Sequence, residues 1–499
     1  MKNKFLLSSL ACISFCTTQA QPSSKLPNII FILADDIGYA DFSCYGAKTI
    51  ATPHIDELAA NGIRFTNAYA PASTSSPSRY ALLTGEYAFR KRVGILPADA
   101  PLTIDPQSNN LPLQLKSSGY TTGIVGKWHL GLGNRNETVD FNKKITAGMR
   151  SVGFDYSYIF PATNDRVPTI FLENDQVVNG DPNDPIKVSY RKKIGNEPTG
   201  KENPDLLTLK YYQGHDGTII NGISRIGWMS GGHKARWNDQ EMGEVLSNQA
   251  VSFIRENKQK PFFLYYATHN AHEPRVPNPK FAGQSKAGIY GDMIEEFDEY
   301  VGRIIETLKK EGIFENTLLI ISSDNAPMIK EGYHDGAEEN IGSHRPCADL
   351  RGAKYSLYEG GTKVPFIVSY PSLVKKPFVQ TQRFSYIDML ATVASITQAK
   401  PYRNSLNDSK DASELFRSPS APVYRDYIIT QNNGGDIAIR KNDWKYIPSK
   451  NELFHLKKDP NEKINLSQTE KGKSIINDLS SIIKNIANKD IQDDILSLT

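Results

Sequence analysis

The sequence predicts an α/β fold in which a mixed, mostly parallel sheet lies between helices, followed by a smaller C-terminal α+β subdomain. Three observations support this prediction. Apolar runs of strand length alternate with segments of helical periodicity along most of the chain. Polar residues follow several of these runs, where α/β sheets place their ligand sites. Near residue 400 the composition changes to polar loops and short strand-like runs. Alternating strands and helices place helices on both faces of a sheet.

The first strand is predicted over residues 27–33, an almost continuous apolar run typical of a strand buried on both faces. The polar stretch 140–237 shows little periodicity and is interpreted as long insertions over the sheet. Further strands are predicted over residues 121–125, 261–267, 317–321 and 364–369. Helices are predicted near residue 52 and over residues 76–84, 242–254, 297–308 and 385–396.

The chain is predicted to have three parts. Residues 1–20 have a positive start, a short apolar core and small residues up to Ala20, which is typical of a signal peptide cleaved after that residue. This predicts a periplasmic or secreted protein. The main domain is expected over residues 21–399 and the C-terminal subdomain over residues 400–499. In the subdomain, short strands and a terminal helix are predicted over residues 427–430, 436–440 and 475–486.

Composition argues against two classes of protein. The chain has 499 residues, of which 39% are hydrophobic and 23% charged, as in ordinary globular proteins. Its net charge of +3 is too close to balance for a nucleic-acid binder. No run is long and apolar enough for a membrane span. Cys44 and Cys347 remain after the signal segment, and they either pair or stay free.

The stretch that starts at Ser75 predicts a short helix with both ends marked. Ser76 suits the N-cap, Pro77 suits the first turn, and Gly85 is a typical C-terminal stop. Ser75 is then expected just ahead of a helix N-terminus, where unpaired N–H groups and the helix dipole favour an anion. Arg79 adds a positive charge one turn further on. An ordinary capped surface helix is the alternative interpretation.

Polar clusters follow four predicted strands. Asp35 and Asp36 end the first strand, and two adjacent carboxylates favour a hard cation such as Ca²⁺ or Mg²⁺ over a soft metal. A solvated turn is the alternative. Since the carboxyl ends of parallel strands share one edge, we expect all four clusters to lie beside Ser75. The other three clusters are Lys127 with His129, His269 with His272, and Asp324 with Asn325.

Lysine and histidine side chains at this edge suit the binding of an anion. Lys127 and His129 are two residues apart, so in an extended chain they point to the same side and can bind an anion and move a proton. Lys354 precedes the strand predicted at 364–369 and is a further candidate anion ligand. For each lysine, ordinary solvent exposure is the alternative.

The stretch Ser75-Ser76-Pro77-Ser78-Arg79, followed by Thr84-Gly85, resembles the signature of the type I sulfatases. That signature is Cys or Ser, any residue, Pro, Ser, Arg and, a few residues later, Thr-Gly. In this family the first residue is oxidised after translation to formylglycine, so Ser75 resembles the serine-type variant. The resemblance runs from about residue 26 to the chain end and is closest to arylsulfatase-like bacterial carbohydrate sulfatases. It implies the alkaline-phosphatase-like α/β fold with a four-stranded C-terminal subdomain.

Other motifs agree with this resemblance in the same order. Lys127 and His129 match the family's G-K-W-H-L-G segment, and Lys354 matches the lysine of K-x-x-x-x-E-G-G. His272 matches the histidine of P-H-x-P, although Ala271 replaces the usual proline. By resemblance, one Ca²⁺, or less favourably Mg²⁺, would be held by five residues. These are Asp35, Asp36, Ser75, Asp324 and Asn325.

The resemblance also implies a mechanism. A hydrated formylglycine at position 75 would attack sulfur with one hydroxyl, and the other would allow sulfate to leave as the aldehyde reforms. Arg79, Lys127 and Lys354 would hold the remaining negative charge. We assign His272 as the general acid toward the leaving alcohol and His129 to proton removal at position 75. His269 would contact substrate without an acid–base role.

The resemblance predicts a sulfuric ester hydrolase that removes sulfate from a sulfated mono- or oligosaccharide. A separate anaerobic sulfatase-maturating enzyme would oxidise Ser75. Two alternatives remain open: a phosphatase or phosphodiesterase of the same superfold that uses unmodified Ser75, and an inactive protein that binds sulfated glycans. Several loop residues are candidates for the sugar pocket, none of them preferred: Asp165, Arg166, His215, Asp216, Arg275 and the loop 333–345.

Overall fold

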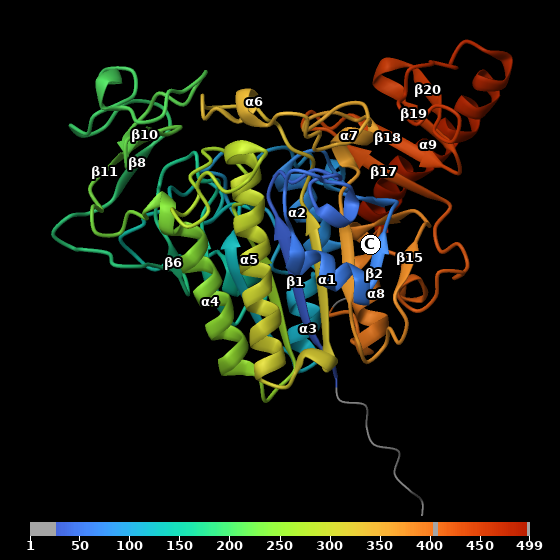
Figure 1. Cartoon of the computed structure of the whole chain (residues 1–499), viewed down its shortest axis with the longest axis horizontal. Coiled ribbons are helices and arrows are strands. Elements are labelled where there is room, and N and C mark those ends of the chain that lie inside the picture. Colours follow the sequence, from blue (N-terminus) through green and yellow to red (C-terminus); the bar gives the residue numbers. More distant parts are fainter. Residues whose placement is uncertain (1–25, 403–407, 497–499) are drawn as a thin grey trace, which may run out of the picture.

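The computed structural model describes residues 26–402 and 408–496 of the 499-residue chain, and the side chains up to residue 487. The predicted signal peptide lies outside the described residues. The fold is a large mixed sheet between helices with a small antiparallel sheet toward the C-terminus, as predicted (Figure 1). Within the described residues, no helix combines the length and hydropathy that crossing a bilayer requires.

The main sheet has ten strands in the order β15-β2-β14-β13-β1-β12-β4-β5-β6-β7. Its central part, from β13 to β5, is parallel, whereas β14 and β6 run antiparallel to their neighbours β13 and β5. Along the sheet the bounds are β15 Phe378–Gln380, β2 Ile63–Phe65, β14 Phe366–Ser369, β13 Thr317–Ser323, β1 Asn28–Ala34, β12 Phe262–Ala267, β4 Thr121–Lys127, β5 Tyr156–Phe160, β6 Leu172–Glu173 and β7 Gln176–Val177.

Strand β1 is buried on both faces, as its apolar run predicts. Ile29 and Phe31 pack in one hydrophobic core, whereas Ile30 and Ile32 pack in a second core on the opposite face, because successive side chains of a strand alternate. The first core includes residues of α2, α3 and α8, and the second includes residues of α1, α4 and α5. These helices are α1 Pro53–Asn61, α2 Ser75–Thr84, α3 Leu111–Ser117, α4 Met242–Asn257, α5 Gly288–Lys310 and α8 Met389–Thr397.

The C-terminal sheet has four antiparallel strands in sequence order, and its core reaches α2. Ala81 of α2 shares a hydrophobic cluster with Ile439 of this sheet and Leu479 of the last helix. The Ser73 N–H also donates to the Gln431 carbonyl (2.8 Å), which ties the chain just before Ser75 to the sheet. The elements are β17 Tyr427–Gln431, β18 Ile437–Lys441, β19 Trp444–Ile447, β20 Glu452–His455 and α9 Glu470–Leu496.

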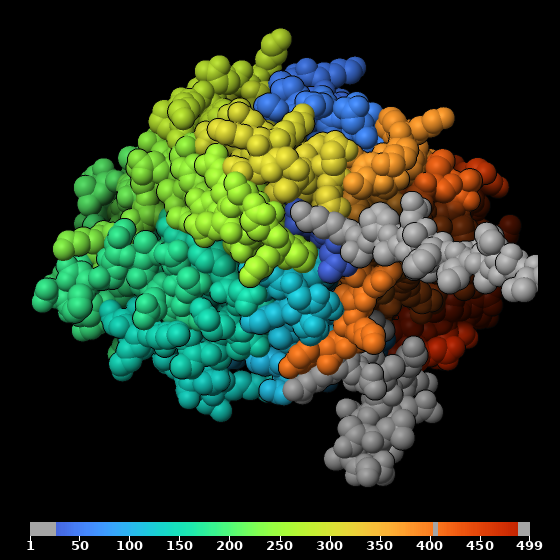
Figure 2. Space-filling view, turned by 90° about the horizontal axis from the view of Figure 1, so that it is seen from below, coloured from blue at the N-terminus to red at the C-terminus, as the bar shows by residue number. Residues whose placement is uncertain are grey.

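The remaining elements are short. The long connection from β4 to α4 lies on one side of the molecule, and the C-terminal sheet lies on the opposite side (Figures 1 and 2). Three two-stranded pairs are β3 Ala68–Tyr69 with β16 Phe384–Ser385, β8 Lys187–Ser189 with β11 Trp228–Ser230, and β9 Ile219–Ile220 with β10 Ile223–Ser224. Short helices are α6 Ala337–Asn340 and α7 Glu359–Thr362. The 3₁₀ turns are Ser43–Tyr45, Ala88–Lys91, Met149–Val152, Pro204–Leu206, Asp239–Glu241, Phe314–Asn316, Tyr386–Asp388, Ser413–Phe416 and Pro448–Lys450.

The structure corrects several predicted elements. The stretch 140–237 is not only insertions, because β5 within it pairs with β4 in the main sheet. Helix α3, the edge strand β15 and its neighbour β2 were not predicted, since each is too short to show a clear period. Helix α5 begins at Gly288 rather than near residue 297, and Tyr290, Met293 and Ile294 of its first turns already belong to its buried face.

Candidate active site

Ser75 is the first residue of α2, and this corrects the predicted N-cap. Thr74, with extended backbone, occupies the N-cap position, two residues before the predicted N-cap Ser76. The Ser76 hydroxyl instead accepts a hydrogen bond from the Leu96 N–H (3.1 Å). Gly85 ends the helix in the left-handed conformation (φ 66°), as predicted. Ser75 therefore presents its hydroxyl at the helix N-terminus, where anions are favoured.

Asp324, directly after β13, joins the serine to Arg79. The Ser75 hydroxyl donates to Asp324 Oδ2 (2.7 Å), and the Arg79 Nε and Nη2 groups donate to the same oxygen at 3.0 and 2.8 Å. Arg79 Nε also lies 2.9 Å from Ser75 Oγ. Burial favours the neutral acid, but the charges of Arg79 and Lys127 outweigh it and hold the pKa of Asp324 well below its usual range. Asp324 is therefore ionised.

Asp35, the residue after β1, lies on the other side of Arg79. Lys127 Nζ donates to Asp35 Oδ2 (2.6 Å), and Arg79 Nη2 lies 3.6 Å from Asp35 Oδ1. Burial outweighs these cations and raises the pKa of Asp35 well above its usual value, and burial likewise lowers the pKa of Lys127. This carboxylate therefore needs more positive charge than its protein neighbours supply.

Three buried carboxylates form a cluster that fits a divalent cation. Asp35, Asp36 and Asp324 each offer an oxygen, and these oxygens lie within 4.8 Å of one another. Among the described residues, Asp35 Oδ1 and Asn325 Oδ1 are buried without a hydrogen-bond partner. Open carboxylate and amide oxygens are the ligands that Ca²⁺ and Mg²⁺ take, so these residues fit a hard cation.

Lys354 lies beside Asp36 and Glu331, and Glu331 was not predicted as a site residue. Lys354 Nζ donates to Asp36 Oδ2 (2.8 Å) and to Glu331 Oε2 (2.7 Å). Burial lowers the pKa of Lys354, but these two carboxylates outweigh burial and raise it well above the usual value, so Lys354 is charged. Glu331 lies in an irregular loop, where neither a strand end nor a periodic pattern singles out one acid.

His129 is a neutral imidazole with one free ring nitrogen. Its Nε2 lies 3.0 Å from the Leu96 carbonyl, which only accepts, so Nε2 carries the proton. Nδ1 is buried and has no hydrogen-bond partner in the part of the chain that is described. Burial and the charges of Lys127 and Arg166 lower the pKa of His129 well below 6.5. The predicted extended arrangement is wrong, because β4 ends at Lys127 and His129 is left-handed (φ 50°).

His272 presents its Nε2 to the acidic cluster. Its Nδ1 lies 2.6 Å from the Glu273 carbonyl and 3.1 Å from Asn164 Oδ1, so Nδ1 carries the proton. Nε2 lies 4.0 Å from Asp36 Oδ2. Burial, then the charges of Lys354 and Lys127, lower the pKa of His272 to about 3, so the ring is neutral in the free protein. His269 is also buried, which lowers its pKa to about 4.

Among the loop residues predicted as sugar-pocket candidates, Asp165 lies near His272 and Arg166 lies near His129. Asp165 forms an ion pair with His215 (3.1 Å). Arg166 donates to the same Leu96 carbonyl that His129 contacts (2.8 Å). Arg275 instead holds loop backbone and Asp335, which indicates a structural role.

The ion pair of His215 with Asp165 predicts a pH-dependent contribution to stability. Burial lowers the pKa of His215, but Asp165 outweighs burial and raises it above 6.5, while His215 holds the pKa of Asp165 well below 3.8. The His215 contribution is complete below pH 6.5 and lost as pH rises through its raised pKa. The Asp165 contribution is complete above pH 3.8 and lost as pH falls through its lowered pKa.

We therefore expect His215→Gln to reduce the free energy of unfolding most between about pH 4 and 6.5 and less on either side. Urea unfolding of both proteins across this range measures the difference. His233→Gln removes a histidine that is 59% exposed beside Asp184 and is the control, since exposed pairs contribute little. A deficit in the His215 variant that does not change with pH contradicts the ion pair.

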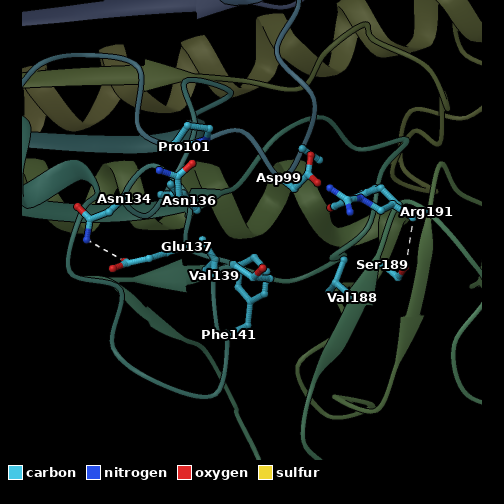
Figure 3. Close-up of a pocket in the computed structure, with 14 residues that line it drawn as sticks. Asp99, Pro101, Asn134, Asn136, Glu137, Val139, Phe141, Val188, Ser189 and Arg191 are labelled. Carbon is cyan, nitrogen blue, oxygen red and sulfur yellow. Dashed lines mark hydrogen bonds between the residues drawn. The ribbon is translucent and has the colours of Figure 1, made fainter.

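Cys44 and Cys347 are both free thiols in the described structure, which decides the alternative left open by the sequence. A cavity of about 490 Å³ lies elsewhere, and its described lining includes none of the predicted site residues. Asp99 and Arg191 lie side by side among its lining residues, and Asn134 donates to Glu137 at the other end of the group (Figure 3). No motif in these loops indicates such a cavity from sequence.

The fold and the site together define a class of enzyme. A hydroxyl at a helix N-terminus, three buried carboxylates and three cations at the strand ends of an α/β sheet suit the hydrolysis of an oxyanion ester. The chain belongs to the sulfatase family, because the family model described as Sulfatase matches residues 27–399. This membership identifies a sulfatase and decides against the phosphatase or phosphodiesterase alternative.

Proteins similar to this chain include named sulfatases. The N-acetylgalactosamine-6-O-sulfatase of Bacteroides thetaiotaomicron is 44% identical over 504 residues, which cover 96% of this chain and 98% of that protein. A solved Bacteroides thetaiotaomicron sulfatase from a glycosaminoglycan-metabolising locus has a TM-score of 0.89 at 45% identity, covering 93% and 99% of the two chains. A structure solved with a neocarrahexaose has a TM-score of 0.65 at 26% identity, covering 92% of each chain.

Proposed function

We propose that this sulfatase removes sulfate from a sulfated carbohydrate and that the first substrate to test is N-acetylgalactosamine 6-sulfate. The observation that carries the substrate class is the 44% identity to a sulfatase named for that sugar, which extends over nearly the whole of both chains. The carbohydrate substrate also agrees with the predicted secretion of the protein into the periplasm or beyond.

Position 75 is proposed to carry formylglycine, formed from Ser75 by a separate maturating enzyme. A serine hydroxyl is a weak nucleophile near neutral pH, whereas a hydrated formylglycine supplies a nucleophile that releases sulfate without leaving a stable ester. A Ca²⁺, or with less support Mg²⁺, held by Asp35, Asp36, Asp324 and Asn325 with the oxygen of residue 75 would supply a Lewis acid. The open oxygens of Asp35 and Asn325 support this ligand set.

The cations of the site are proposed to bind the sulfate group. Arg79 lies within hydrogen-bond distance of Ser75 Oγ, so it orients the oxygen of residue 75 and offsets negative charge there. Lys127 and Lys354 each donate to a carboxylate of the acidic cluster, which places their ammonium groups at its edge. A sulfate ester that enters between them would meet two buried cations in a site of low dielectric.

The two histidines are proposed to move protons at opposite ends of the reaction. The Leu96 carbonyl fixes the proton of His129 on Nε2, which leaves the lone pair of Nδ1 free to remove a proton at residue 75. In His272, Asn164 and the Glu273 carbonyl hold a ring proton on Nδ1. Nε2 is therefore the atom that transfers a proton to the leaving oxygen. His272 is neutral at rest, and a bound sulfate beside Lys354 would raise its pKa.

Two measurements on protein from a host that modifies Ser75 test this proposal. We expect the peptide that contains position 75 to be lighter by two hydrogens and to react with an aldehyde reagent. We also expect release of sulfate from N-acetylgalactosamine 6-sulfate and little release of phosphate from the matching phosphate ester. Active protein with only unmodified serine would contradict the aldehyde mechanism. Binding of the sugar sulfate without turnover by fully modified protein would indicate the glycan-binding alternative.

A further inference from the structure

Tyr355 combines exposure with an unusual backbone. It follows the buried Lys354, yet 37% of it is exposed, which makes it one of the few exposed large hydrophobic residues of the described chain. Its φ is +72°, a left-handed conformation that is rare for a bulky side chain. Such strain persists only where the surrounding structure fixes it, and it is common at functional sites.

The contacts of Tyr355 place its ring at the mouth of the active site. Its N–H donates to the Ser73 carbonyl (2.9 Å), two residues before Ser75. Its hydroxyl donates to Glu331, the same carboxylate that accepts from Lys354. The Lys354 ammonium lies 5.5 Å from the centre of the Tyr355 ring. The side chain of Glu331 is 22% exposed, whereas that of Lys354 is 3% exposed, so the ring borders the route from solvent to the buried cation.

The left-handed turn explains how adjacent residues occupy such different surroundings. It directs the Lys354 ammonium inward to Asp36 while the next side chain faces outward. A tyrosine ring that only filled space would not require a left-handed backbone. Burying its apolar surface would also be more favourable in free energy than exposing it to water.

We propose that Tyr355 is a stacking platform for the pyranose ring that carries the sulfate. One face of a pyranose is rich in C–H groups and covers an aromatic ring well, and aromatic side chains contribute large contact areas at low entropy cost. With the sulfate held near Lys354, the sugar ring would extend toward solvent over the tyrosine. Tyr355 would position the substrate without taking part in proton transfer. This inference rests on the proposed carbohydrate substrate.

The test compares Tyr355→Gly with Tyr355→Phe in protein made without the maturating enzyme, in which Ser75 stays unmodified and the sugar sulfate is bound without turnover. The glycine variant removes the ring and suits the left-handed backbone, whereas the phenylalanine variant keeps the ring and loses the hydroxyl. We expect the Kd for N-acetylgalactosamine 6-sulfate to rise about tenfold in Y355G and less than about threefold in Y355F. The Kd for inorganic sulfate should change less than about twofold in either variant, because the anion site remains. Calorimetric titration measures both constants.

Gln398→Gly is the matched control for the backbone. Gln398 is exposed, ends α8 and also has a left-handed backbone (φ 56°). We expect neither glycine variant to lose Tm, since relief of the left-handed strain offsets the entropy that glycine adds to the unfolded state. Q398G should keep both dissociation constants of the wild type.

Three outcomes overturn the platform: unchanged sugar binding by Y355G, an equal loss of sulfate binding, or a loss in Y355F as large as in Y355G. The last result would assign the effect to the hydroxyl and Glu331. Failure of the proposed function is a separate result, seen as fully modified wild-type protein that binds the sugar sulfate without turnover. Wild-type protein that binds no sugar sulfate overturns both proposals.

Discussion

Ser75→Ala is expected to lower kcat/KM for sulfate ester hydrolysis by at least about 10⁴-fold in protein made where position 75 is modified. Alanine has no oxygen to oxidise, to attack sulfur or to contact the cation. The variant also leaves Asp324 Oδ2 without the hydrogen bond it accepts from the serine, although Arg79 still donates to that oxygen. The fold should therefore survive, with circular dichroism and Tm close to those of the wild type.

The matched control for this loss is Thr397→Ala in α8, outside the signature. The Thr397 hydroxyl donates to the Val393 carbonyl (2.7 Å) and accepts from the Ala399 N–H (3.3 Å), so its removal costs two hydrogen bonds but touches no site residue. We expect T397A to keep kcat/KM within about threefold of the wild type. Residual activity in S75A at a tenth of the wild type or more would show that another group supplies the nucleophile.

Asp324→Ala is expected to reduce both the stability and the activity of the protein strongly. Arg79 is fully buried, and removal of its partner leaves a charge with only the more distant Asp35 beside it. Breaking a buried ion pair in this way costs about 3–5 kcal/mol of unfolding free energy. The variant also removes one of the three carboxylates proposed to hold the cation. We therefore expect hydrolysis to be lost and the rise in Tm on adding Ca²⁺ to shrink.

A second buried pair separates these two effects. Arg425 Nη2 lies 2.5 Å from Asp388 Oδ1, both side chains are almost fully buried, and neither belongs to the site. Asp388→Ala should reduce stability by a similar amount, about 3–5 kcal/mol, because it also strands a buried arginine. It should keep the Ca²⁺-dependent rise in Tm and the kcat/KM of its folded fraction. Equal responses of D324A and the wild type to Ca²⁺ would contradict Asp324 as a ligand.

The sequence predicts the structure well where a residue pattern is compatible with only one local arrangement. The apolar run at 27–33 predicts a strand buried on both faces, and side chains of β1 do pack in two opposite cores. The rule that parallel strands end at a shared edge brings Asp35, Lys127 and Asp324 together, and the structure places them in one network with Arg79. Here local pattern and sheet topology determine the same arrangement.

The sequence is less informative where loops decide the geometry. Glu331, Asn164 and the Leu96 carbonyl fix Lys354, His272 and His129, yet each lies in irregular chain whose path depends on distant contacts. The left-handed backbone of His129 and Tyr355 is likewise invisible to periodicity, since glycine is the usual signal for that conformation. The predicted N-cap of α2 was wrong by two residues because several neighbouring Ser and Thr residues suit an N-cap equally well.

The place of β1 in the sheet has a consequence for biosynthesis. It is the first strand made, yet its partners are β12, which starts at Phe262, and β13, which starts at Thr317. At ribosomal rates its two edges stay unpaired for roughly ten seconds to a minute after it is made. During that time a seven-residue, almost wholly apolar strand is a template for aggregation. We therefore expect a fragment that ends before β13 to leave one edge of β1 unpaired and to aggregate more readily than the complete chain.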